Sequence, residues 1–278
     1  MTVSTQIQTC YRHADRRAGV ICQRCDRPIC PDCMRQASVG FHCPECTKAG
    51  AQKIIRPAQL LRPVVTQVLI AINLAVFALG IGPGLQTRGA VTIDGGLIAR
   101  GVTSANQVIG VATGEWWRIV TSGFLHANLI HVGFNMFVLY RLGQLLEPAL
   151  GRARFLLVYV VALVGGALGV MILDPNQLTV GASGAVFGLM GAAVAVFRSR
   201  GINVMDTGVG AMVLLNLAFT FAIPGISIGG HLGGLISGFV VGWILTDGGP
   251  RYLKDPSLVI GAAVALGVVL AGSAVLVA

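Results

Sequence analysis

The sequence predicts an all-α polytopic membrane protein preceded by a small zinc-binding domain. The 278 residues are 54% hydrophobic and only 11% charged, with a mean hydropathy of +0.77. This composition is typical of a chain with several membrane spans and unlike that of a soluble globular protein. All seven cysteines fall within the first 46 residues, so the N-terminal fifth has a different chemistry from the apolar remainder.

The N-terminal segment carries four ligand pairs, each with a two-residue gap. Eight ligands of this kind are enough for two tetrahedral zinc ions, because a pair with a two-residue gap grips one metal through a tight turn. No open coordination position is implied, so the zinc would be structural and the module would fold on metal. The predicted ligands are Cys10, His13, Cys22, Cys25, Cys30, Cys33, Cys43 and Cys46.

Two pairings of these ligands are compatible with the spacing. Interleaved pairing resembles the cross-braced B-box type of zinc finger, and sequential pairing is the alternative. His42 is an alternative ligand to Cys43, although the regular gap favours the cysteine. A disulfide framework would need an oxidising compartment and would leave one of the seven cysteines unpaired.

The module is also rich in arginine, and this basic face suits anionic lipid better than nucleic acid. We therefore expect no nucleic-acid partner. The module is expected to bind a protein partner, the membrane surface or the cytoplasmic face of the same chain.

The whole chain divides into four parts by composition. Residues 1–47 form the cytoplasmic zinc-binding module, residues 48–63 a basic linker, residues 64–247 a core of six transmembrane helices, and residues 248–278 a loop and a seventh transmembrane helix. The seven apolar segments lie at about 64–82, 129–147, 154–173, 183–199, 207–223, 229–247 and 257–278. Several are just long enough to cross a hydrocarbon core of roughly 30 Å.

The charges of the loops predict the orientation. Residues 1–9 are polar and lack the apolar region of a secretory signal peptide, which places the N-terminus in the cytoplasm. Of the nine arginines after the first apolar segment, six lie on or beside the connections that would then be cytoplasmic, whereas the outer connections after the third and fifth segments carry no Lys or Arg. The other three, Arg88, Arg100 and Arg118, lie in the long first outer loop, and long loops obey the charge rule weakly. Seven crossings put the C-terminus outside, as for a bacterial plasma-membrane protein.

Polar residues gather at one depth of this predicted bilayer. The second, fourth and sixth segments all run from outside to inside, and their outer ends carry His131 with Asn135, Ser183, and His231. Polar groups inside apolar helices are costly, so they are either functional or mutually satisfied. The convergence of all four residues favours a function.

The residue types suit acyl transfer by a Ser–His dyad without an acidic third member. Ser183 would be the nucleophile and His231 the general base, while Asp94 and Asp174 lie in outer loops and are poorly placed. His131 and Asn135 are four residues apart, so both face a developing oxyanion from one side of a helix. His126 and Asn128 are expected to line a path for water.

Four glycines and one aromatic residue support this arrangement. Gly181 and Gly184 flank the serine and let the backbone approach a substrate, while Gly234 and Gly238 let the histidine helix approach the serine helix. Phe187 lies one turn after Ser183 and is placed to stack on the His231 ring, although ordinary core packing would also explain it.

The motifs together resemble the rhomboid family of intramembrane serine proteases over residues 64–247. They are Gly181-x-Ser183-Gly184, His131-x-x-x-Asn135, His231-x-x-Gly234-x-x-x-Gly238, Trp117-Arg118 and Gly143-x-x-x-Glu147. The resemblance implies a six-helix core plus a seventh helix, a Ser183–His231 dyad, and an oxyanion site at His131 and Asn135. Gly230 departs from the alanine that this family usually has there, which predicts looser packing without loss of activity.

The resemblance also implies the reaction, which is hydrolysis of a peptide bond in or near a transmembrane segment of a membrane-protein substrate. Single-span proteins with helix-breaking residues near the cleaved bond would be the preferred partners, and catalysis needs no cofactor. Two alternatives remain: a catalytically inactive rhomboid-like binding or quality-control factor, and a small-molecule transporter. Rhomboid-like binding factors typically lack the serine or the histidine. The charged residues of the fourth to sixth segments, Arg198 and Asp247, lie at the ends of these segments, so no charge lies in their interior to couple an ion.

Overall fold

The computed structural model describes residues 8–37, 39–50, 62–246 and 256–278. The chain divides into two compact units, Met1–Gln59 and Leu60–Ala278, and each is described here by itself. Most of the predicted basic linker, at residues 51–61, and the loop at residues 247–255 lie outside the described residues. The predicted domain boundaries therefore stay a prediction.

The N-terminal unit is built from short elements around its cysteines. Two antiparallel two-stranded sheets pair β1 (Val20–Ile21) with β2 (Pro28–Ile29) and β3 (Arg35–Gln36) with β4 (Phe41–His42). A 3-10 turn, η1 (Pro31–Cys33), and the helix α1 (Pro44–Ala49) complete it. Its buried cluster consists of five cysteines and Ile29. A unit this small, with so little apolar core, needs a metal or another cross-link to be stable.

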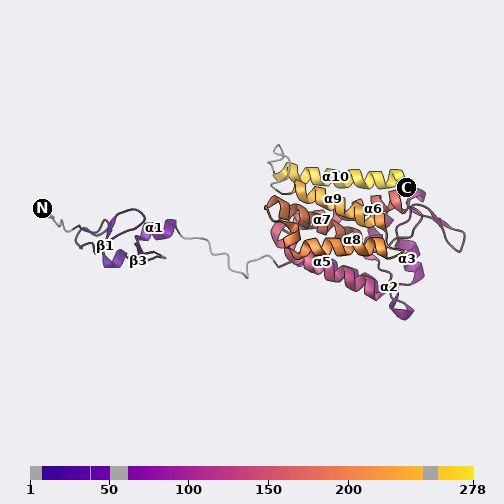
Figure 1. Cartoon of the computed structure of the whole chain (residues 1–278), viewed down its shortest axis with the longest axis horizontal. Coiled ribbons are helices and arrows are strands. Elements are labelled where there is room, and N and C mark those ends of the chain that lie inside the picture. Colours follow the sequence, from indigo (N-terminus) through magenta and orange to yellow (C-terminus); the bar gives the residue numbers. More distant parts are fainter. Residues whose placement is uncertain (1–7, 38, 51–61, 247–255) are drawn as a thin grey trace. The chain divides into compact units, whose positions relative to one another are not determined.

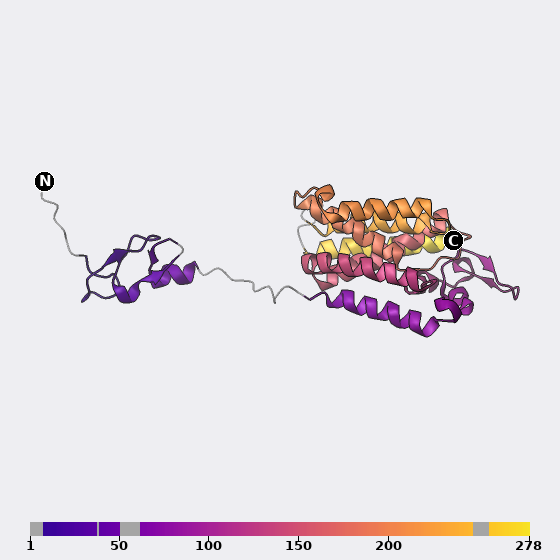
Figure 2. The ribbon, with the colours of Figure 1, turned by 60° about the horizontal axis from the view of Figure 1, so that its bottom comes forward.

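The second unit is a bundle of apolar helices, as the sequence predicts. Each predicted apolar segment contains one helix: α2 (Val64–Gly80), α5 (Leu129–Leu150), α6 (Arg152–Leu173), α7 (Ser183–Ser199), α8 (Gly208–Ala222), α9 (Ile228–Ile244) and α10 (Pro256–Val277). They run roughly alongside one another in Figures 1 and 2. Among the described residues, three helices are long and apolar enough to cross a membrane, Leu129–Leu150, Arg152–Leu173 and Ser257–Val277, while four further apolar helices are shorter.

The segment between α2 and α5 is folded and not an open loop. It contains η3 (Pro83–Leu85), α3 (Gly89–Gly95), the hairpin of β5 (Gly101–Val102) and β6 (Val108–Ile109), η4 (Val111–Thr113), α4 (Arg118–Thr121) and η5 (Ser122–Phe124). These elements lie at one end of the bundle, the end at which the chain terminates (Figure 1). A further 3-10 turn, η6 (Val204–Asp206), precedes α8.

Arg118 anchors this segment from inside. Its side chain is 1% exposed, and its Nη1 donates to the carbonyl oxygens of Ile93 at 2.6 Å and Gly96 at 2.8 Å. Its Nε donates to Glu115 at 2.7 Å. Burial alone would raise the pKa of the Glu115 carboxyl, but Arg118 and the Gly110 N–H outweigh burial and lower that pKa.

At the opposite end of the bundle, Glu147 ties α5 to α2. The buried carboxylate accepts hydrogen bonds from the backbone N–H groups of Val65 and Thr66 and from the Thr66 hydroxyl, at 2.7–2.9 Å. These N–H groups belong to the first turn of α2, where the helix itself offers no acceptor. A carboxylate there is also favoured by the helix dipole.

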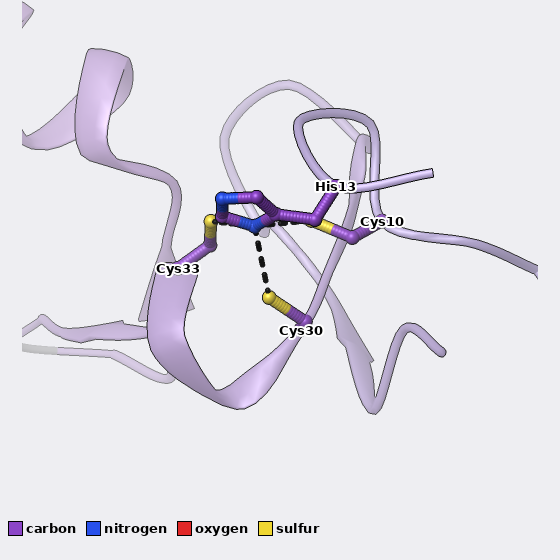
Figure 3. A group of neighbouring side chains, drawn as sticks. All are labelled: Cys10, His13, Cys30 and Cys33. Carbon is purple, nitrogen blue, oxygen red and sulfur yellow. Dashed lines mark hydrogen bonds between the residues drawn. The ribbon is translucent and has the colours of Figure 1, made fainter. Parts of the chain in front are cut away.

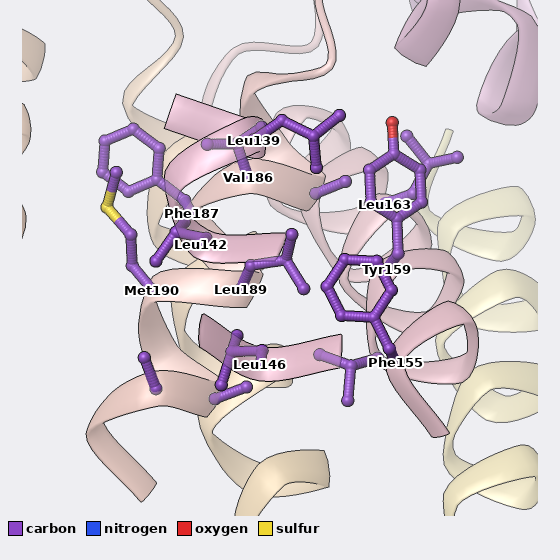
Figure 4. Close-up of a cluster of buried hydrophobic side chains, with 14 of the residues drawn as sticks. Leu139, Leu142, Leu146, Phe155, Tyr159, Leu163, Val186, Phe187, Leu189 and Met190 are labelled. Carbon is purple, nitrogen blue, oxygen red and sulfur yellow. The ribbon is translucent and has the colours of Figure 1, made fainter. Parts of the chain in front are cut away.

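The core lies between α5, α6 and α7. Figure 4 shows Phe155 and Tyr159 of α6 on one side, facing Leu139, Leu142 and Leu146 of α5 and side chains of α7 such as Leu189. Helix α7 is buried along most of its length, including Leu189 and Met190 at 0% exposure. The helix that begins at Ser183 is therefore the most enclosed element of the unit.

Glycine pairs hold α9 directly against α7. A Cβ added at Gly234 would overlap the carbonyl of Gly184, and one at Gly238 would overlap Gly188. Only residues without side chains allow backbones this close. The separation between the N-terminal ends of α7 and α9, where Ser183 and His231 lie, is thus set by backbone contact.

Candidate active site

Ser183 is the first residue of α7, directly after a glycine turn. Gly181 has φ +134, and a Cβ there would lie 2.8 Å from His131 Nε2, so both its backbone angle and its surroundings require glycine. Two hydrogen bonds fix the turn: the Gly181 N–H donates to Ser122 O at 2.9 Å, and the Ala182 N–H donates to His126 Nε2 at 3.4 Å. The N–H of Ser183 belongs to the first turn of α7 and has no acceptor within the helix.

His231 lies in the first turn of α9 and is 8% exposed. Phe187, one turn after Ser183 on α7, stacks on the imidazole with a centroid separation of 3.9 Å and an interplanar angle of 16°. The Nδ1 atom lies 2.7 Å from the hydroxyl oxygen of Thr220 on α8. The ring is therefore contacted on one face by Phe187 and on one edge by Thr220.

Ser183 and His231 line the same two cavities. The smaller has a volume of about 30 Å³ and is also lined by Ser122, Thr179 and Ser227. A cavity of this size with hydroxyl groups in its lining has room for a water molecule. The larger, of about 680 Å³, reaches α5 and α8. Among the described residues, no hydrogen bond joins the Ser183 hydroxyl to His231; in enzymes without substrate such contacts are often long.

His131 and Asn135 also line the larger cavity. His131 Nδ1 accepts from the Ala127 N–H at 3.4 Å, so the ring proton of a neutral imidazole resides on Nε2, the atom nearest to Gly181. Asn135 Nδ2 donates one proton to His131 O at 3.0 Å and keeps a second. Both side chains thus retain an N–H donor beside the serine turn.

The acidic residue near this site binds a helix end. Asp174 Oδ2 accepts from the Ser227 hydroxyl at 2.6 Å and from the Gly229 N–H at 2.9 Å. Ser227 in turn caps α9 by accepting from the Gly230 N–H. Asp174 therefore fixes the start of the helix that carries His231 and makes no hydrogen bond to the imidazole itself.

Two expectations about neighbouring residues have different outcomes. Asn128 lines the larger cavity and caps α5 by accepting from the His131 N–H at 2.9 Å. His126 is 1% exposed and lines neither of these two cavities, so its place on a water path stays a prediction. Its ring is used to hold the turn before Ser183.

Thr220 was not predicted from the sequence as part of this site. A signal for it was present, because Asn216 and Thr220 are polar, four residues apart and inside an apolar segment, which is the pattern that singled out His131 and Asn135. Both are buried and line the larger cavity.

The eight predicted metal ligands form two groups, and their grouping is interleaved. One comprises Cys10, His13, Cys30 and Cys33 (Figure 3), and the other Cys22, Cys25, Cys43 and Cys46; within each group the ligand atoms lie within 4.8 Å of one another. His13 Nδ1 is 3.4 Å from the sulfur atoms of both Cys30 and Cys33, and Cys25 Sγ is 3.8 Å from Cys43 Sγ. A tetrahedral site with metal–sulfur bonds of about 2.3 Å separates two sulfurs by about 3.8 Å. The groups therefore fit metal ions.

The cysteines are free thiols, and one in each group ionises readily. Burial opposes ionisation of Cys10, but hydrogen bonds from backbone N–H groups, that of Arg12 foremost, outweigh it and lower its pKa to about 6. Cys22 has its pKa lowered to about 6 in the same way, with Arg24 and Cys43 as the main donors. A thiolate is the form that binds metal.

The fold and the site define a class: a polytopic helical membrane protein with polar residues of several helices gathered around one half-buried serine. Residues 113–248 match the rhomboid domain family. The chain belongs to the rhomboid family, a family of intramembrane proteases.

Curated relatives carry the same family name. The chain is 35% identical over 181 residues to rhomboid protease GluP of Bacillus subtilis, covering 64% of this chain and 34% of that protein. It is 38% identical over 143 residues to the putative rhomboid protease YdcA of the same species, covering 49% and 70%. Rhomboid-like protease 1 of Toxoplasma gondii is 38% identical over 148 residues, covering half of each chain. The chain thus spans about a third of the first of these relatives and 70% of the second.

Proposed function

We propose that this chain is an intramembrane serine endopeptidase that cleaves membrane-protein substrates with Ser183 as nucleophile and His231 as general base. The observation that carries the proposal is that both residues line one cavity from the ends of two helices held at backbone contact. Membership of the rhomboid family supports it.

In the first step, the Ser183 hydroxyl oxygen attacks the carbonyl carbon of the substrate peptide bond. His231 Nε2 accepts the hydroxyl proton as the new C–O bond forms. The carbonyl π electrons move to the oxygen and give a tetrahedral oxyanion. Three donors would stabilise this oxyanion: the Ser183 N–H, the Nε2–H of His131 and the free Nδ2 proton of Asn135.

The second half of the reaction releases the products. The C–N bond breaks as His231 gives its proton to the leaving amine, which leaves an ester between Ser183 and the N-terminal part of the substrate. Water then attacks the ester with His231 again as base, and Ser183 leaves as the alcohol. The smaller cavity, of about 30 Å³ and lined in part by Ser122 and Thr179, offers room for that water beside both residues.

The larger cavity suits a substrate that arrives from the lipid. Its lining includes apolar residues of α5 and α8 that are also exposed on the outside of the bundle: Ile130 at 84%, Phe134 at 45% and Phe219 at 40%. A hydrophobic segment can thus pass from the bilayer to Ser183 between these helices. The segment must be extended near the cleaved bond, since a helix hides its carbonyl groups in hydrogen bonds.

The test is cleavage in liposomes by the wild type, Ser183→Ala and Ser199→Ala. Ser199 is the last residue of the same helix, and its hydroxyl bonds to Val196 O, away from the cavities. We expect cleavage of a single-span substrate near its outer membrane boundary, lost by at least about 10⁴-fold in Ser183→Ala and kept in Ser199→Ala. Equal cleavage by wild type and Ser183→Ala would refute the proposal. An inactive wild type whose Ser183 also resists a serine-reactive probe would favour the binding-factor alternative.

The same proposal includes the N-terminal unit and the topology. Two structural zinc ions would occupy the two ligand groups, with no role in the cleavage step. The N-terminus would be cytoplasmic and the C-terminus outside, with residues 64–247 as the six-helix core, so the zinc module would meet partners or lipid on the cytoplasmic side. Cysteine-accessibility labelling from either side of sealed vesicles tests this orientation, and outside labelling of the N-terminal unit would contradict it.

A further inference from the structure

We infer that Thr220 is a positioning residue that holds His231 in the tautomer and ring orientation required of a general base. This inference rests on the proposed Ser183–His231 dyad. It assigns to α8, which carries none of the residues of that dyad, a defined part in the chemistry.

The hydrogen bonds around Thr220 determine where the imidazole proton lies. Thr220 is 2% exposed, and its hydroxyl donates to the carbonyl oxygen of Asn216 at 2.8 Å. A hydroxyl has a single proton, so the same oxygen must act as acceptor in its 2.7 Å contact with His231 Nδ1. The Nδ1 atom therefore carries the proton, and the Nε2 atom of the neutral ring keeps its lone pair.

This tautomer is the one that the proposed reaction needs. A general base must present an unprotonated nitrogen to the serine, and in triads an aspartate bound to the other ring nitrogen ensures it. Here Asp174 is engaged with Ser227 and Gly229, so it does not take that part. Its place is taken by a chain of two hydrogen bonds between neutral groups, which runs from His231 Nδ1 through the Thr220 hydroxyl to the Asn216 carbonyl oxygen.

The ring orientation is restricted from two directions. Phe187 stacks on the face of the imidazole and limits its tilt, while Thr220 fixes its rotation by binding one edge. Without Thr220, the ring could rotate within the plane that Phe187 leaves open. Nδ1 would then lose its acceptor, and the population with Nε2 ready to accept a proton would fall.

A purely structural role for Thr220 must be separated from this one. A threonine inside a helix commonly bonds to the carbonyl four residues earlier, as Thr220 does, and that bond alone would satisfy its proton. The positioning role concerns the acceptor side of the same oxygen. It predicts an effect on the chemical step, whereas lost packing affects stability.

The experiment compares two pairs that differ only in the hydroxyl: wild type with Thr220→Val, and Thr220→Ser with Thr220→Ala. The second pair lacks the methyl group in both members, so its packing change cancels. Each protein is reconstituted in liposomes, and kcat and KM for a single-span substrate are measured with the thermal midpoint. We expect each hydroxyl-free member to have a kcat about tenfold lower than its partner, with KM within twofold.

A second readout needs no transmembrane substrate. A fluorophosphonate probe reacts when the serine oxygen attacks phosphorus, fluoride leaves and the serine proton passes to the base. Its labelling rate should fall by the same factor in Thr220→Val and Thr220→Ala, and Thr220→Ser should stay near the wild-type rate. Labelling and kcat within twofold across both pairs would overturn the inference.

Failure of this inference and failure of the proposed function give different results. If Ser183→Ala cleaves like the wild type, the dyad itself is wrong. If Ser183→Ala is inactive and unlabelled while the Thr220 pairs are equal, the protease assignment stands and the positioning role is refuted. A fall in thermal midpoint without a fall in kcat would likewise assign Thr220 to stability alone.

Discussion

Replacing Gly234 with alanine tests whether backbone contact between α7 and α9 sets the geometry of the proposed dyad. The added Cβ would overlap the carbonyl oxygen of Gly184 and would lie 2.7 Å from its carbonyl carbon and 3.1 Å from its Cα, whereas ordinary contact begins near 3.4 Å. All three obstructing atoms are backbone, so no side chain can rotate away. To bring the distance from the Cβ to the Gly184 carbonyl carbon from 2.7 Å up to the ordinary contact of about 3.4 Å, the helices must separate by at least about 0.7 Å.

The expected cost is larger for catalysis than for stability. Overpacking of this kind costs about 1–3 kcal/mol, partly offset by the better helix propensity of alanine, which is worth about 1 kcal/mol. Ser183 lies one residue before Gly184 and His231 one turn before Gly234, so the shift falls directly on the reacting groups. A misplacement of about 1 Å can lower the rate by about 10²-fold. We therefore expect kcat to fall by roughly that factor with a modest loss of stability.

The matched control is Gly230→Ala, on the same helix and next to His231. Its Cβ would meet the Ser227 hydroxyl at 3.0 Å and a Val170 methyl at 3.3 Å, and these side-chain atoms can give way. We expect this variant to keep at least half of the wild-type kcat. The assay is liposome cleavage of a single-span substrate with thermal unfolding of the same preparations. Wild-type kcat in Gly234→Ala, or equal losses in both variants, would refute the reasoning.

Three further predictions concern the supports of the site and the N-terminal unit. Glu147→Gln should lower the free energy of unfolding in detergent by about 2–4 kcal/mol, because an amide offers one acceptor oxygen to three donors. Thr66→Val removes only the hydroxyl donor and should lower it by less. A smaller loss in Glu147→Gln than in Thr66→Val would contradict this account. The lowered pKa of Glu115 implies a contribution to stability that is complete at pH values above its usual pKa of 4.5 and is lost as pH falls through the lowered pKa. The thermal midpoint of the wild type should therefore drop in acid, and that of Glu115→Gln should drop less steeply. Identical pH profiles of the two proteins would exclude this role. Metal analysis should find two zinc ions per chain in the wild type and in His42→Ala and about one in Cys43→Ser; two ions in Cys43→Ser, or cysteines found in disulfides, would count against the ligand sets.

The apolar helices and the candidate metal ligands were predictable because simple rules govern them. A membrane span is recognisable from its length and hydropathy, and α5, α6, α7 and α10 begin within two residues of the predicted positions. The paired gaps of Cys10 to Cys46 specify metal chelation, but they leave the pairing open, and only the three-dimensional structure brings Cys10 beside Cys30.

The rest depends on contacts that no periodicity encodes. Nothing in the spacing showed that Asp174 would bind the start of α9, that His126 would hold the turn before Ser183, or that Thr220 would face His231. These partners come from different helices or from segments without a repeating pattern. The segment between α2 and α5 was recognisable from the sequence only as a long loop containing Trp117 and Arg118. Its folding around the Arg118 guanidinium is seen only in the three-dimensional structure.

The distribution of the site over several helices has a consequence for biosynthesis. His131 is on α5, Ser183 on α7, Thr220 on α8 and His231 on α9, so the residues of the site leave the ribosome in that order over about a hundred residues of chain. No intermediate that lacks α9 contains both the serine and its proposed base. Because the base comes last of these residues, a nascent chain whose α9 has not yet entered the bilayer has no complete proteolytic centre with which to attack itself or its neighbours in the insertion machinery.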